Sequence, residues 1–441
     1  MNIRFGTDGV RGLANDALTT EIALAIGRAA VMVLDAEKVV IGRDTRRSGP
    51  MLEHAVAAGA CSEGANVELL GVVPTPLVAH AAGNDVGIMI SASHNPYADN
   101  GIKIFGPGGA KLTDAQQQEI ESVSSELLNS GSNPGPTGVD VGEITTDETA
   151  IESYLTEIES ALQGRTLTGT RLVVDCANGS NSEIAPRLFK QLHSRIDAIG
   201  VEPDGVNIND NCGSTSPAAL AARVVATGAD MGIAFDGDAD RLIAVDHEGK
   251  IVDGDQILAI CAKDLAERSM LADQCVVVTV MSNLGFFQAM EQAGIKVIQT
   301  AVGDRYVLEE LNAGGYSLGG EQSGHIIFRD LSPTGDGLLA AVILVDAVIR
   351  SGRTLAECAA DAMVRLPQVL RNVVVKEPSA AVEFLQGAVK RAEEELAGTG
   401  RVLVRASGTE PKVRLMVEAV DEEHAAKIVS ELEAELARLQ D

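Results

Sequence analysis

The chain has 441 residues, 45% of them hydrophobic and 22% charged, and a formal net charge of −28 at pH 7. This charge argues against nucleic acid or an anionic membrane as a partner, because polyanions are repelled at long range. The length predicts about three or four domains, and with no Trp and 3% aromatic residues their cores have to be filled by Val, Ile, Leu and Ala, which favours layered α/β packing.

Runs rich in Val and Ile alternate with helical patterns three times before the pattern changes near residue 365. The expected strands cover residues 39–44 and 86–90 in the first unit, 171–175 and 231–235 in the second, and 275–280 in the third. These runs are continuously apolar, so we expect helices on both faces of each sheet. Functional sites should then lie at the carboxyl ends of the strands.

Domain boundaries are marked by composition. Residues 131–142 are rich in Gly, Pro and Ser, and an amphipathic helix with apolar residues from Ile151 to Leu162 follows them, with Thr146 or Asp147 available as its cap. The second boundary lies near Gly254. The tail predicts a strand (373–375), a helix (380–396), two adjacent strands (402–406 and 413–419) and a helix (422–439), which is an α+β domain with an antiparallel sheet. We therefore predict four domains, residues 1–147, 148–253, 254–364 and 365–441.

Ser93 follows the apolar run 86–90 and precedes a turn that Asn95-Pro96 enforces, because proline restricts both its own backbone and that of the residue before it. The hydroxyl is therefore presented at a strand end beside His94. Ser-His neighbours alone do not decide the function, since both residues also cap or pack for structural reasons. Lys103 lies beyond Asn100-Gly101, which we expect to form a turn that folds the lysine back towards the serine.

The segment Asp236-Gly-Asp-Ala-Asp-Arg241 predicts a cation site. Alternate residues of an extended segment project to one side, so the carboxylates of Asp236, Asp238 and Asp240 would converge and repel without a cation, and hard oxygen ligands suit Mg²⁺ or Ca²⁺. A calcium EF-hand is disfavoured because Arg241 and His247 occupy its Gly and Glu positions, and the flanks read as strands. A phosphatase of the haloacid dehalogenase type would need Thr or Val in place of Asp240. Apolar flanks disfavour an acidic surface turn.

Two further loops carry hydrogen-bonding groups. The segment from Gly319 to His325 offers a carboxylate, a hydroxyl and an imidazole suited to sugar hydroxyls, although a tight turn or helix cap explains it equally well in isolation. The segment from Arg405 to Arg414 offers two guanidinium groups, two hydroxyls and the amides around Gly408, a set that binds phosphate. An ordinary hairpin turn is the alternative there.

Four motifs, taken together and in this order, resemble those of the α-D-phosphohexomutase superfamily: Ser91-Ala-Ser-His-Asn-Pro96, Asp236-Gly-Asp-Ala-Asp-Arg241, Gly320-Glu-Gln-Ser-Gly-His325 and Arg405-Ala-Ser-Gly-Thr-Glu-Pro411. The resemblance extends from Phe5 to Ala419. The stretch from Phe5 to Gly12, and Gln322 after Gly319-Gly320, are similar to the branch that acts on glucosamine phosphates. Residues 300–305 also resemble a substrate-contacting loop of the superfamily.

The resemblance implies three similar α/β/α mixed-sheet domains and a smaller α+β domain around a central cleft, with phosphoserine, metal, sugar and phosphate sites on successive domains. The implied roles are catalytic for Ser93, His94, Lys103, Arg11 and Arg241; metal-binding for Ser93, Asp236, Asp238 and Asp240; substrate-binding for Glu321, Ser323, His325, Asp304 and Arg305; and phosphate-binding for Arg405, Ser407, Gly408, Thr409 and Arg414. One Mg²⁺ per chain, a covalent phosphoserine at Ser93 and a homodimer are implied as well.

The implied reaction interconverts glucosamine 6-phosphate and glucosamine 1-phosphate through phosphoserine, with glucosamine 1,6-bisphosphate as intermediate and activator. It would supply UDP-N-acetylglucosamine and cell-wall synthesis. A mutase for mannose or glucose phosphates would use the same residues and is the alternative. A catalytically silent sugar-phosphate sensor is disfavoured, because it would not need Lys103 beside an intact Ser93 and three carboxylates.

The location is expected to be the reducing cytoplasm. Six cysteines are scattered without a Cys-x-x-Cys pair, which indicates neither a zinc site nor a disulfide framework. The amino-terminal residues carry charges where a signal peptide needs an apolar core. The longest apolar stretch, residues 338–349, contains Asp346 and is too short to span a bilayer.

Overall fold

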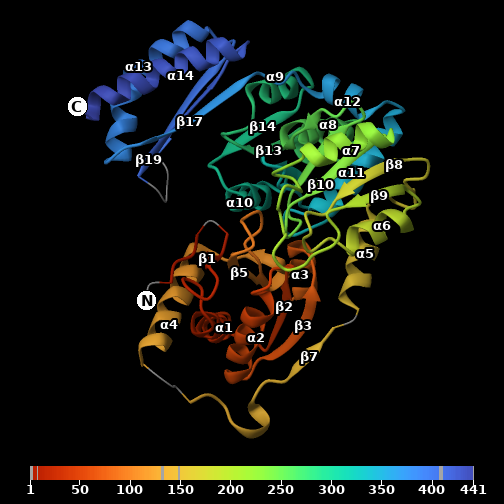
Figure 1. Ribbon diagram of the computed structural model, residues 1–441, viewed down its shortest axis with the longest axis vertical. Coiled ribbons are helices and arrows are strands. Elements are labelled where there is room, and N and C mark those ends of the chain that lie inside the picture. The colour runs from red at the N-terminus through yellow and green to blue at the C-terminus, as the bar shows by residue number, and fades with distance from the viewer. Residues whose placement is uncertain (1–2, 7, 131–133, 148, 407–410, 441) are drawn as a thin grey trace. The chain divides into compact units, whose positions relative to one another are not determined.

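The computed structural model describes residues 3–6, 8–130, 134–147, 149–406 and 411–440. It divides into two compact units, one formed by residues 1–280 with 295–360 and the other by residues 281–294 with 361–441. The first unit contains three separate sheets and the second contains one (Figure 1).

The first sheet has the order β1-β5-β4-β2-β3-β7, with β6 paired to β5. Its strands are β1 (Val10–Leu13), β2 (Lys38–Arg43), β3 (Asn66–Val72), β4 (Val86–Ile90), β5 (Asp99–Gly106), β6 (Ala110–Lys111) and β7 (Ile144–Thr146), and its helices are α1 (Thr20–Leu34), α2 (Gly49–Ser62), α3 (Thr75–Ala82) and α4 (Asp114–Ser130). The crossover from β2 to β3 and that from β3 to β4 run in opposite directions along the sheet, so α2 and α3 cover opposite faces. Strand β4, between them, is completely buried.

The second sheet has the order β12-β11-β10-β8-β9, and the third has the order β14-β13-β15-β16. The second contains β8 (Arg171–Asp175), β9 (Arg195–Ile199), β10 (Met231–Phe235), β11 (Leu242–Asp246) and β12 (Ile251–Val252), with α5 (Ala150–Ser160), α6 (Ile184–Gln191) and α7 (Ala218–Thr227). The third contains β13 (Cys275–Thr279), β14 (Lys296–Thr300), β15 (Leu318–Gly320) and β16 (Ile326–Phe328), with α8 (Gly254–Glu267), α10 (Asp304–Gly314), α11 (Gly337–Ser351) and α12 (Leu355–Ala362). Antiparallel pairs adjoin parallel strands in both sheets, namely β10–β11 and β11–β12 in the second and β15–β16 in the third, so both sheets are mixed.

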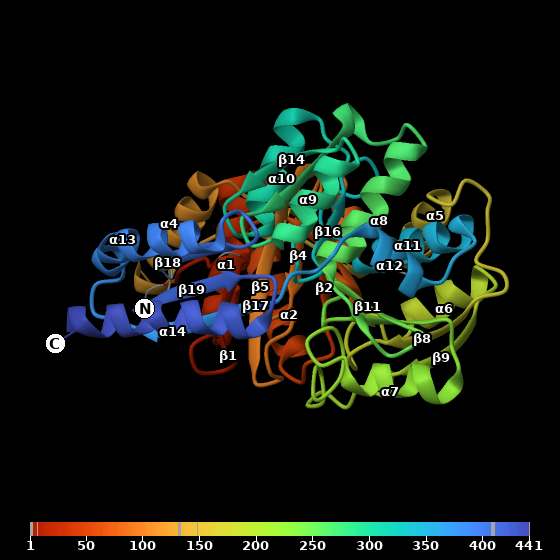
Figure 2. The ribbon, with the colours of Figure 1, turned by 90° about the horizontal axis from the view of Figure 1, so that it is seen from above.

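The second unit is built on a three-stranded antiparallel sheet of order β17-β19-β18. It contains α9 (Leu284–Gln292), β17 (Gln368–Val374), α13 (Pro378–Leu396), β18 (Arg401–Ala406), β19 (Lys412–Glu418) and α14 (Glu422–Gln440). Helices α13 and α14 lie side by side along this sheet (Figures 1 and 2), and a core of Val, Leu, Ile and Ala side chains lies between them and the strands. Helix α9 belongs to this unit although it follows β13 in the sequence.

The predicted fold class is confirmed, with mixed α/β sheets followed by a smaller antiparallel domain. The predicted strands at 86–90, 171–175 and 231–235 match β4, β8 and β10 residue for residue. The expected turn at Asn100-Gly101 is wrong. Both residues lie within β5, and the chain reverses earlier, between β4 and β5. Pairing of Gly101 with Arg11 in the ladder between β1 and β5 keeps these residues in a strand. Glycine is needed at residue 101 because a Cβ atom would clash with the carbonyl of Ser91.

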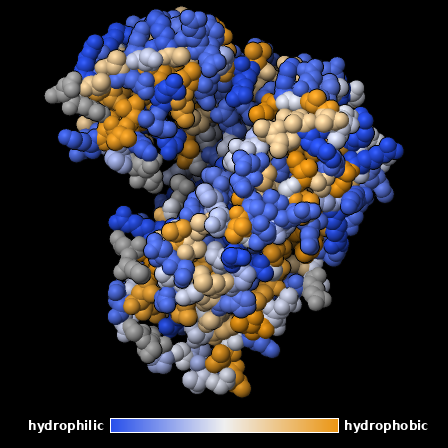
Figure 3. Space-filling model, in the orientation of Figure 1, coloured by the Kyte–Doolittle hydropathy of each residue, from blue (hydrophilic) through white to orange (hydrophobic). Residues whose placement is uncertain are grey.

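Hydrophilic residues predominate on the face shown in Figure 3, and the six cysteines are buried and free. Within the described part of the chain, no helix has the length and apolar character of a membrane span.

Candidate active site

Ser93 lies in the turn that joins β4 to β5, and it is 1% exposed. Its hydroxyl donates a 2.6 Å hydrogen bond to Asp236 Oδ2, and His94 Nδ1 lies 3.2 Å from Ser93 Oγ. Its backbone has a φ of +52°, in the left-handed region that serine rarely enters. The structure therefore brings the predicted nucleophile to the predicted metal loop, which comes from a different sheet.

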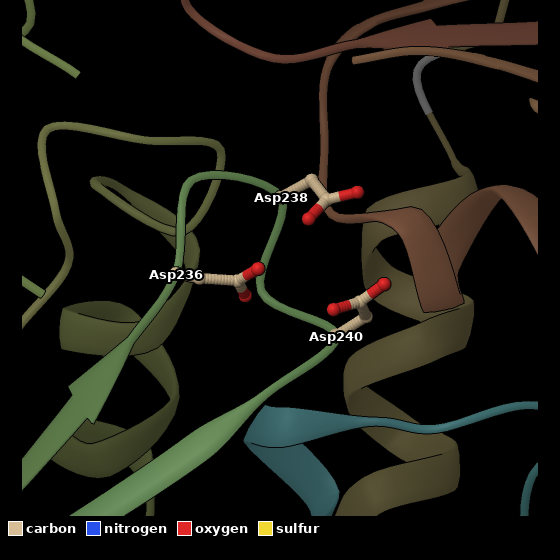
Figure 4. A group of neighbouring side chains, drawn as sticks. All are labelled: Asp236, Asp238 and Asp240. Carbon is tan, nitrogen blue, oxygen red and sulfur yellow. The ribbon is translucent and has the colours of Figure 1, made fainter. Parts of the chain in front are cut away.

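The three predicted metal ligands lie in the loop between β10 and β11. One ligand atom from each of Asp236, Asp238 and Asp240 lies within 4.8 Å of the others, all three residues are buried, and the carboxylates face one another across the loop (Figure 4). The expected extended conformation is wrong, because the loop is a turn in which Ala239 has a φ of +60° and donates its amide to the carbonyl of Asp236. The carboxylates converge because the turn folds them together.

The electrostatics of this loop favour a bound cation. Burial, together with the nearby Asp240 and Asp238 carboxylates, raises the pKa of Asp236 well above its usual range. Asp238 Oδ1 and Asp240 Oδ1 are buried and have no hydrogen-bond partner among the described residues. Buried carboxylate oxygens that lack donors and repel one another fit a hard divalent ion such as Mg²⁺.

Lys103 lies on β5 opposite Met89, and its side chain is 3% exposed. Its ammonium lies 2.7 Å from Asp238 Oδ2, 3.1 Å from Asp240 Oδ2 and 2.6 Å from Asp8 Oδ2. Burial alone would lower the pKa of Lys103, but these carboxylates raise it well above its ordinary value. The lysine is thus held as a cation beside the metal loop.

Asp8 and Lys111 join this cluster, although neither is among the site residues predicted from the sequence. Asp8 accepts from Arg11 at 2.8 Å and contacts Lys103, while Lys111 pairs with both Asp8 and Asp304. Asp8 could have been predicted as a site residue, because it lies in the same Phe5–Gly12 motif as Arg11. Lys111 carries no local signal, since its partners come from residues far away in the sequence.

His325 lies at the far end of the same cluster. Its Nε2 is 3.2 Å from Asp304 Oδ2 and its Nδ1 is 3.7 Å from Asp240 Oδ1. Burial disfavours the charged imidazole, yet these two carboxylates raise the pKa of His325 overall. His325 therefore lies between Asp240 of the aspartate loop and Asp304.

His94 and Arg241 complete the surroundings of Ser93. Burial, with the nearby Arg241 and Arg11 guanidinium groups, lowers the pKa of His94 to about 4, so the imidazole is neutral at pH 7. Arg241 follows the metal loop, and its amide donates to Asp236 Oδ1 at 3.2 Å. The cations that a phosphorylated serine would need lie close to Ser93.

Glu321 and Ser323 lie in the turn between β15 and β16. Glu321 Oε1 accepts from the amide of Gly303, and Ser323 Oγ lies 3.4 Å from Glu321 Oε2. Arg305 differs from the other predicted substrate residues, because its guanidinium pairs with Asp114 and Glu309. Asp114 begins α4 and Glu309 lies on α10, so Arg305 joins two helices in this structure.

Arg405 and Arg414 lie in the second unit, on β18 and β19, and are direct cross-strand partners. Their side chains therefore leave the same face of the antiparallel sheet, as a two-arginine phosphate site requires. The other predicted phosphate-binding residues, Ser407, Gly408 and Thr409, lie outside the described residues.

Comparison with protein families identifies four consecutive matches, all to phosphoglucomutase/phosphomannomutase domains. Alpha/beta/alpha domains I, II and III match residues 2–129, 152–249 and 253–366, and the C-terminal domain matches residues 370–435.

Full-length relatives are close in sequence. The chain is 52% identical over 441 residues to a phosphoglucosamine mutase of Anoxybacillus flavithermus, with 98% of this chain and 97% of the relative covered. It is 50% identical over 437 residues to a phosphoglucosamine mutase of Mycobacterium ulcerans, with 97% of each covered.

Solved structures share the fold. A phosphoglucomutase/phosphomannomutase family protein from Burkholderia thailandensis has a TM-score of 0.83 at 26% identity, with 98% of this chain and 97% of that one covered. The N-acetylphosphoglucosamine mutase of Aspergillus fumigatus, solved with GlcNAc-6P and magnesium, has a TM-score of 0.70 at 18% identity, with 99% and 96% covered.

Proposed function

The chain belongs to the phosphoglucomutase/phosphomannomutase family, and from this premise we propose that it acts as a phosphoglucosamine mutase, interconverting glucosamine 6-phosphate and glucosamine 1-phosphate. The observation that carries the proposal is the meeting of Ser93 Oγ with the buried aspartate loop, 2.6 Å from Asp236, with Lys103 bound to the same loop. The relatives at 50–52% identity support glucosamine phosphate as the substrate.

Phosphorylated Ser93 is the proposed phosphoryl donor. A hydroxyl oxygen of glucosamine 6-phosphate attacks the phosphorus, the bond from phosphorus to the serine oxygen breaks, and glucosamine 1,6-bisphosphate results. The bisphosphate then turns, and its other phosphoryl group returns to the serine oxygen, which releases glucosamine 1-phosphate. The transition state of each transfer is loose, so positioning and charge stabilisation supply most of the acceleration.

The residues that would hold one Mg²⁺ are Asp236, Asp238 and Asp240, together with an oxygen of phosphorylated Ser93. When bound, the ion would neutralise the carboxylates and withdraw charge from the serine oxygen. Arg11 and Arg241 contribute further positive charge, since Arg11 pairs with Asp8 near Lys103 and Arg241 follows the aspartate loop. A phosphoserine with about −1.5 to −2 charges needs this compensation.

Proton transfer is assigned to Lys103 and His94. The attacking hydroxyl loses a proton, and the serine oxygen gains one whenever it is left unphosphorylated. His94 Nδ1 lies 3.2 Å from Ser93 Oγ, and the Lys103 ammonium lies against the metal loop. Both groups therefore lie in the surroundings of the transferred phosphoryl group.

Substrate recognition is assigned to Glu321, Ser323, His325, Asp304 and Arg305 for the sugar, and to Arg405, Ser407, Gly408, Thr409 and Arg414 for the phosphate that does not react. Hydroxyls and carboxylates suit sugar hydroxyls, and paired guanidinium groups suit phosphate. The central cleft, the domain boundaries at 147, 253 and 364, a cytoplasmic location and a homodimer remain predictions of the same proposal.

A comparison of substrates tests the proposal. The purified protein is supplied with Mg²⁺ and a trace of sugar 1,6-bisphosphate, and conversion of glucosamine 6-phosphate is compared with that of glucose and mannose phosphates. A strong preference for the amino sugar is expected. Equal or greater activity on the hexose phosphates would keep the chemistry but contradict the substrate.

A further inference from the structure

Arg46 is a completely buried cation beneath the turn that carries Ser93. Its side chain has no solvent exposure, and neither does that of its acidic partner, Asp44. Arg46 Nε donates to Asp44 Oδ2 at 2.8 Å, and the amide of Arg46 donates to Asp44 Oδ1 at 3.0 Å. A guanidinium group buried to this degree is costly unless its hydrogen-bonding capacity is used.

The remaining donors of Arg46 are directed at the backbone of a single turn. Nη2 donates to the carbonyls of Ser93 and Asn95, both at 2.8 Å, and Nη1 donates to those of Asp99, at 2.9 Å, and Pro96. These carbonyls would repel one another without a shared donor. One planar guanidinium group therefore determines how the chain passes from β4 to β5.

Two further side chains, those of Ser91 and Asn209, hold the same turn. Ser91 Oγ donates to Asp44 Oδ2 at 2.6 Å and accepts from the amide of Ser93 at 2.9 Å, which extends the Arg46–Asp44 pair to the backbone of Ser93 itself. From the second sheet's side, Asn209 Nδ2 donates to the carbonyl of Ser93 at 2.9 Å. The left-handed backbone of Ser93 is strained, and such a conformation persists only where several surrounding contacts hold it in place.

We propose that Arg46 is a positioning residue for phosphoryl transfer: it fixes the turn between β4 and β5 so that Ser93 Oγ faces the aspartate loop. The inference rests on the proposed function, in which Ser93 carries the phosphoryl group. Arg46 acts through the carbonyls and never through the reacting oxygen. It should therefore affect the rate of transfer much more than the binding of the sugar.

The test compares Arg46→Lys and Arg46→Met with Arg43→Lys and Arg43→Met. Arg43 is a matched control because it lies on the neighbouring strand β2 and pairs with the buried Glu53 at 2.9 Å, on the side of the strand that packs against α2. For each variant the readouts are kcat and KM for glucosamine 6-phosphate, the rate at which a sugar 1,6-bisphosphate phosphorylates Ser93, and hydrogen exchange of the amides of residues 91–99.

Both Arg46 variants are expected to lose on the order of 100-fold in kcat, with KM changed by less than about threefold, because a small misplacement of the reacting oxygen slows transfer without removing sugar contacts. Ser93 phosphorylation should slow by the same factor, and amides 91–99 should exchange faster. Lysine should fail to rescue, since it keeps the charge but lacks the planar fork. The Arg43 variants should have the kcat of the wild-type protein.

The proposal is overturned if the sugar 1,6-bisphosphate phosphorylates Ser93 as fast in folded Arg46 variants as in the Arg43 variants. It is also overturned if hydrogen exchange of the amides of residues 91–99 is unchanged in the Arg46 variants. Where Arg46→Met does not fold, Asn209→Gly replaces it, because glycine accepts the left-handed backbone of residue 209 and removes the donor to Ser93. A severalfold loss of kcat at constant KM is expected for Asn209→Gly, and an unchanged kcat in both Asn209→Gly and Arg46→Lys contradicts the proposal. Wild-type protein without mutase activity would refute the proposed function, while the exchange measurement would still decide whether Arg46 holds the turn.

Discussion

At the scale of single residues, Ser93 combines a strained backbone with a nearly complete lack of exposure. Its hydroxyl lies between the Asp236 carboxylate and the His94 imidazole. A serine that only completed the packing would not need a left-handed backbone or a carboxylate partner from another sheet. Storage of strain at this position is consistent with a reacting oxygen held in one orientation.

Ser93→Ala is expected to reduce turnover by at least about 1,000-fold, because it removes the oxygen that accepts and donates the phosphoryl group. The loss of one hydrogen bond should lower stability by only about 1 kcal/mol. Ser182→Ala is a matched control, since Ser182 is also buried and its hydroxyl donates to the Gly179 carbonyl. Steady-state kinetics with thermal unfolding measure both effects, and near-normal activity in Ser93→Ala would refute the relay.

The reactive and metal-binding residues of this site were predictable from the sequence, whereas the ion pairs and hydrogen bonds that surround them were not. Ser93 and the three aspartates carry local motifs, and the structure brings them together. The pairing of Lys111 with Asp8 and Asp304 depends on how the first and third sheets pack, and no spacing along the chain encodes it. The same holds for Arg46, whose donors reach a turn about fifty residues later in the sequence.

At the scale of elements, the loop between β10 and β11 approaches the Ser93 turn so closely that only glycine fits at residue 237. A Cβ atom there would lie 2.7 Å from the carbonyl of Ser93. The loop therefore places its carboxylates and the serine within one small volume. Burial and repulsion from Asp240 and Asp238 raise the pKa of Asp236, and a cation bound there would offset both.

Mg²⁺ is expected to stabilise the protein, by about 2.7 kcal/mol when its free concentration is 100 times its dissociation constant. The midpoint of thermal unfolding should rise with Mg²⁺ in the wild type and stay constant in Asp238→Asn. Asp230→Asn, which changes a more exposed aspartate just before β10, should respond like the wild type. Removal of the metal by a chelator should abolish mutase activity, and full activity in metal-free protein would contradict the assignment.

Helix α5 contacts α11 through a buried acid. Tyr154 on α5 donates to the carboxylate of Asp336 at 2.9 Å, and Asp336 caps α11 by accepting from the amide of Leu339. Burial raises the pKa of Asp336 to about 6. Its folded-state pKa is higher than its unfolded value, so stability should fall as the pH rises from about 4 to about 6.

Asp336→Asn should remove this pH dependence, because the amide resembles the protonated acid. Relative to the wild type, the variant should gain up to about 3 kcal/mol of stability between pH 4 and pH 7, from a shift of about two pKa units. Unfolding midpoints of both proteins across this range measure the difference. A difference that stays constant with pH would show that Asp336 does not titrate as described.

The strands were predictable because continuous apolar runs between polar loops identify buried strands without knowledge of their partners. Runs 86–90 and 231–235 show this, since every residue in them is buried. Asn100-Gly101 was misassigned because Asn-Gly is a strong turn signal, and here the ladder between β1 and β5 overrides it. At these two residues, strand pairing outweighs the local preference for a turn.

At the scale of the whole molecule, the two compact units do not coincide with the regions that match the family domains. Helix α9 lies within the region matched by domain III, yet it groups with the C-terminal residues. Glu418, which is completely buried, explains this grouping. It accepts from the amide of Leu284, from Asn283 Nδ2 at 3.3 Å, from Gln368 Nε2 at 2.8 Å and from Arg401 Nε at 2.6 Å.

Glu418→Ala is expected to destabilise this second unit by about 3–5 kcal/mol, because it leaves Arg401 without its buried partner. Amides of α9 and of β17 to β19 should lose protection from hydrogen exchange, while those of β4 and β10 should keep it. Glu395→Ala, at an exposed pair with Lys427 on the same unit, should change nothing measurable. Equal loss of protection in β4 and β10 would contradict the assignment of Glu418 to the packing of the second unit.

The central claim is that phosphoryl groups pass through Ser93, and a rapid-quench experiment tests it most directly. The protein is first phosphorylated with labelled sugar 1,6-bisphosphate, freed of excess label, and then mixed with glucosamine 6-phosphate. The account predicts one label per chain on Ser93, and its transfer to the sugar at a rate at least equal to kcat. Label on another residue, or transfer slower than turnover, would contradict the account.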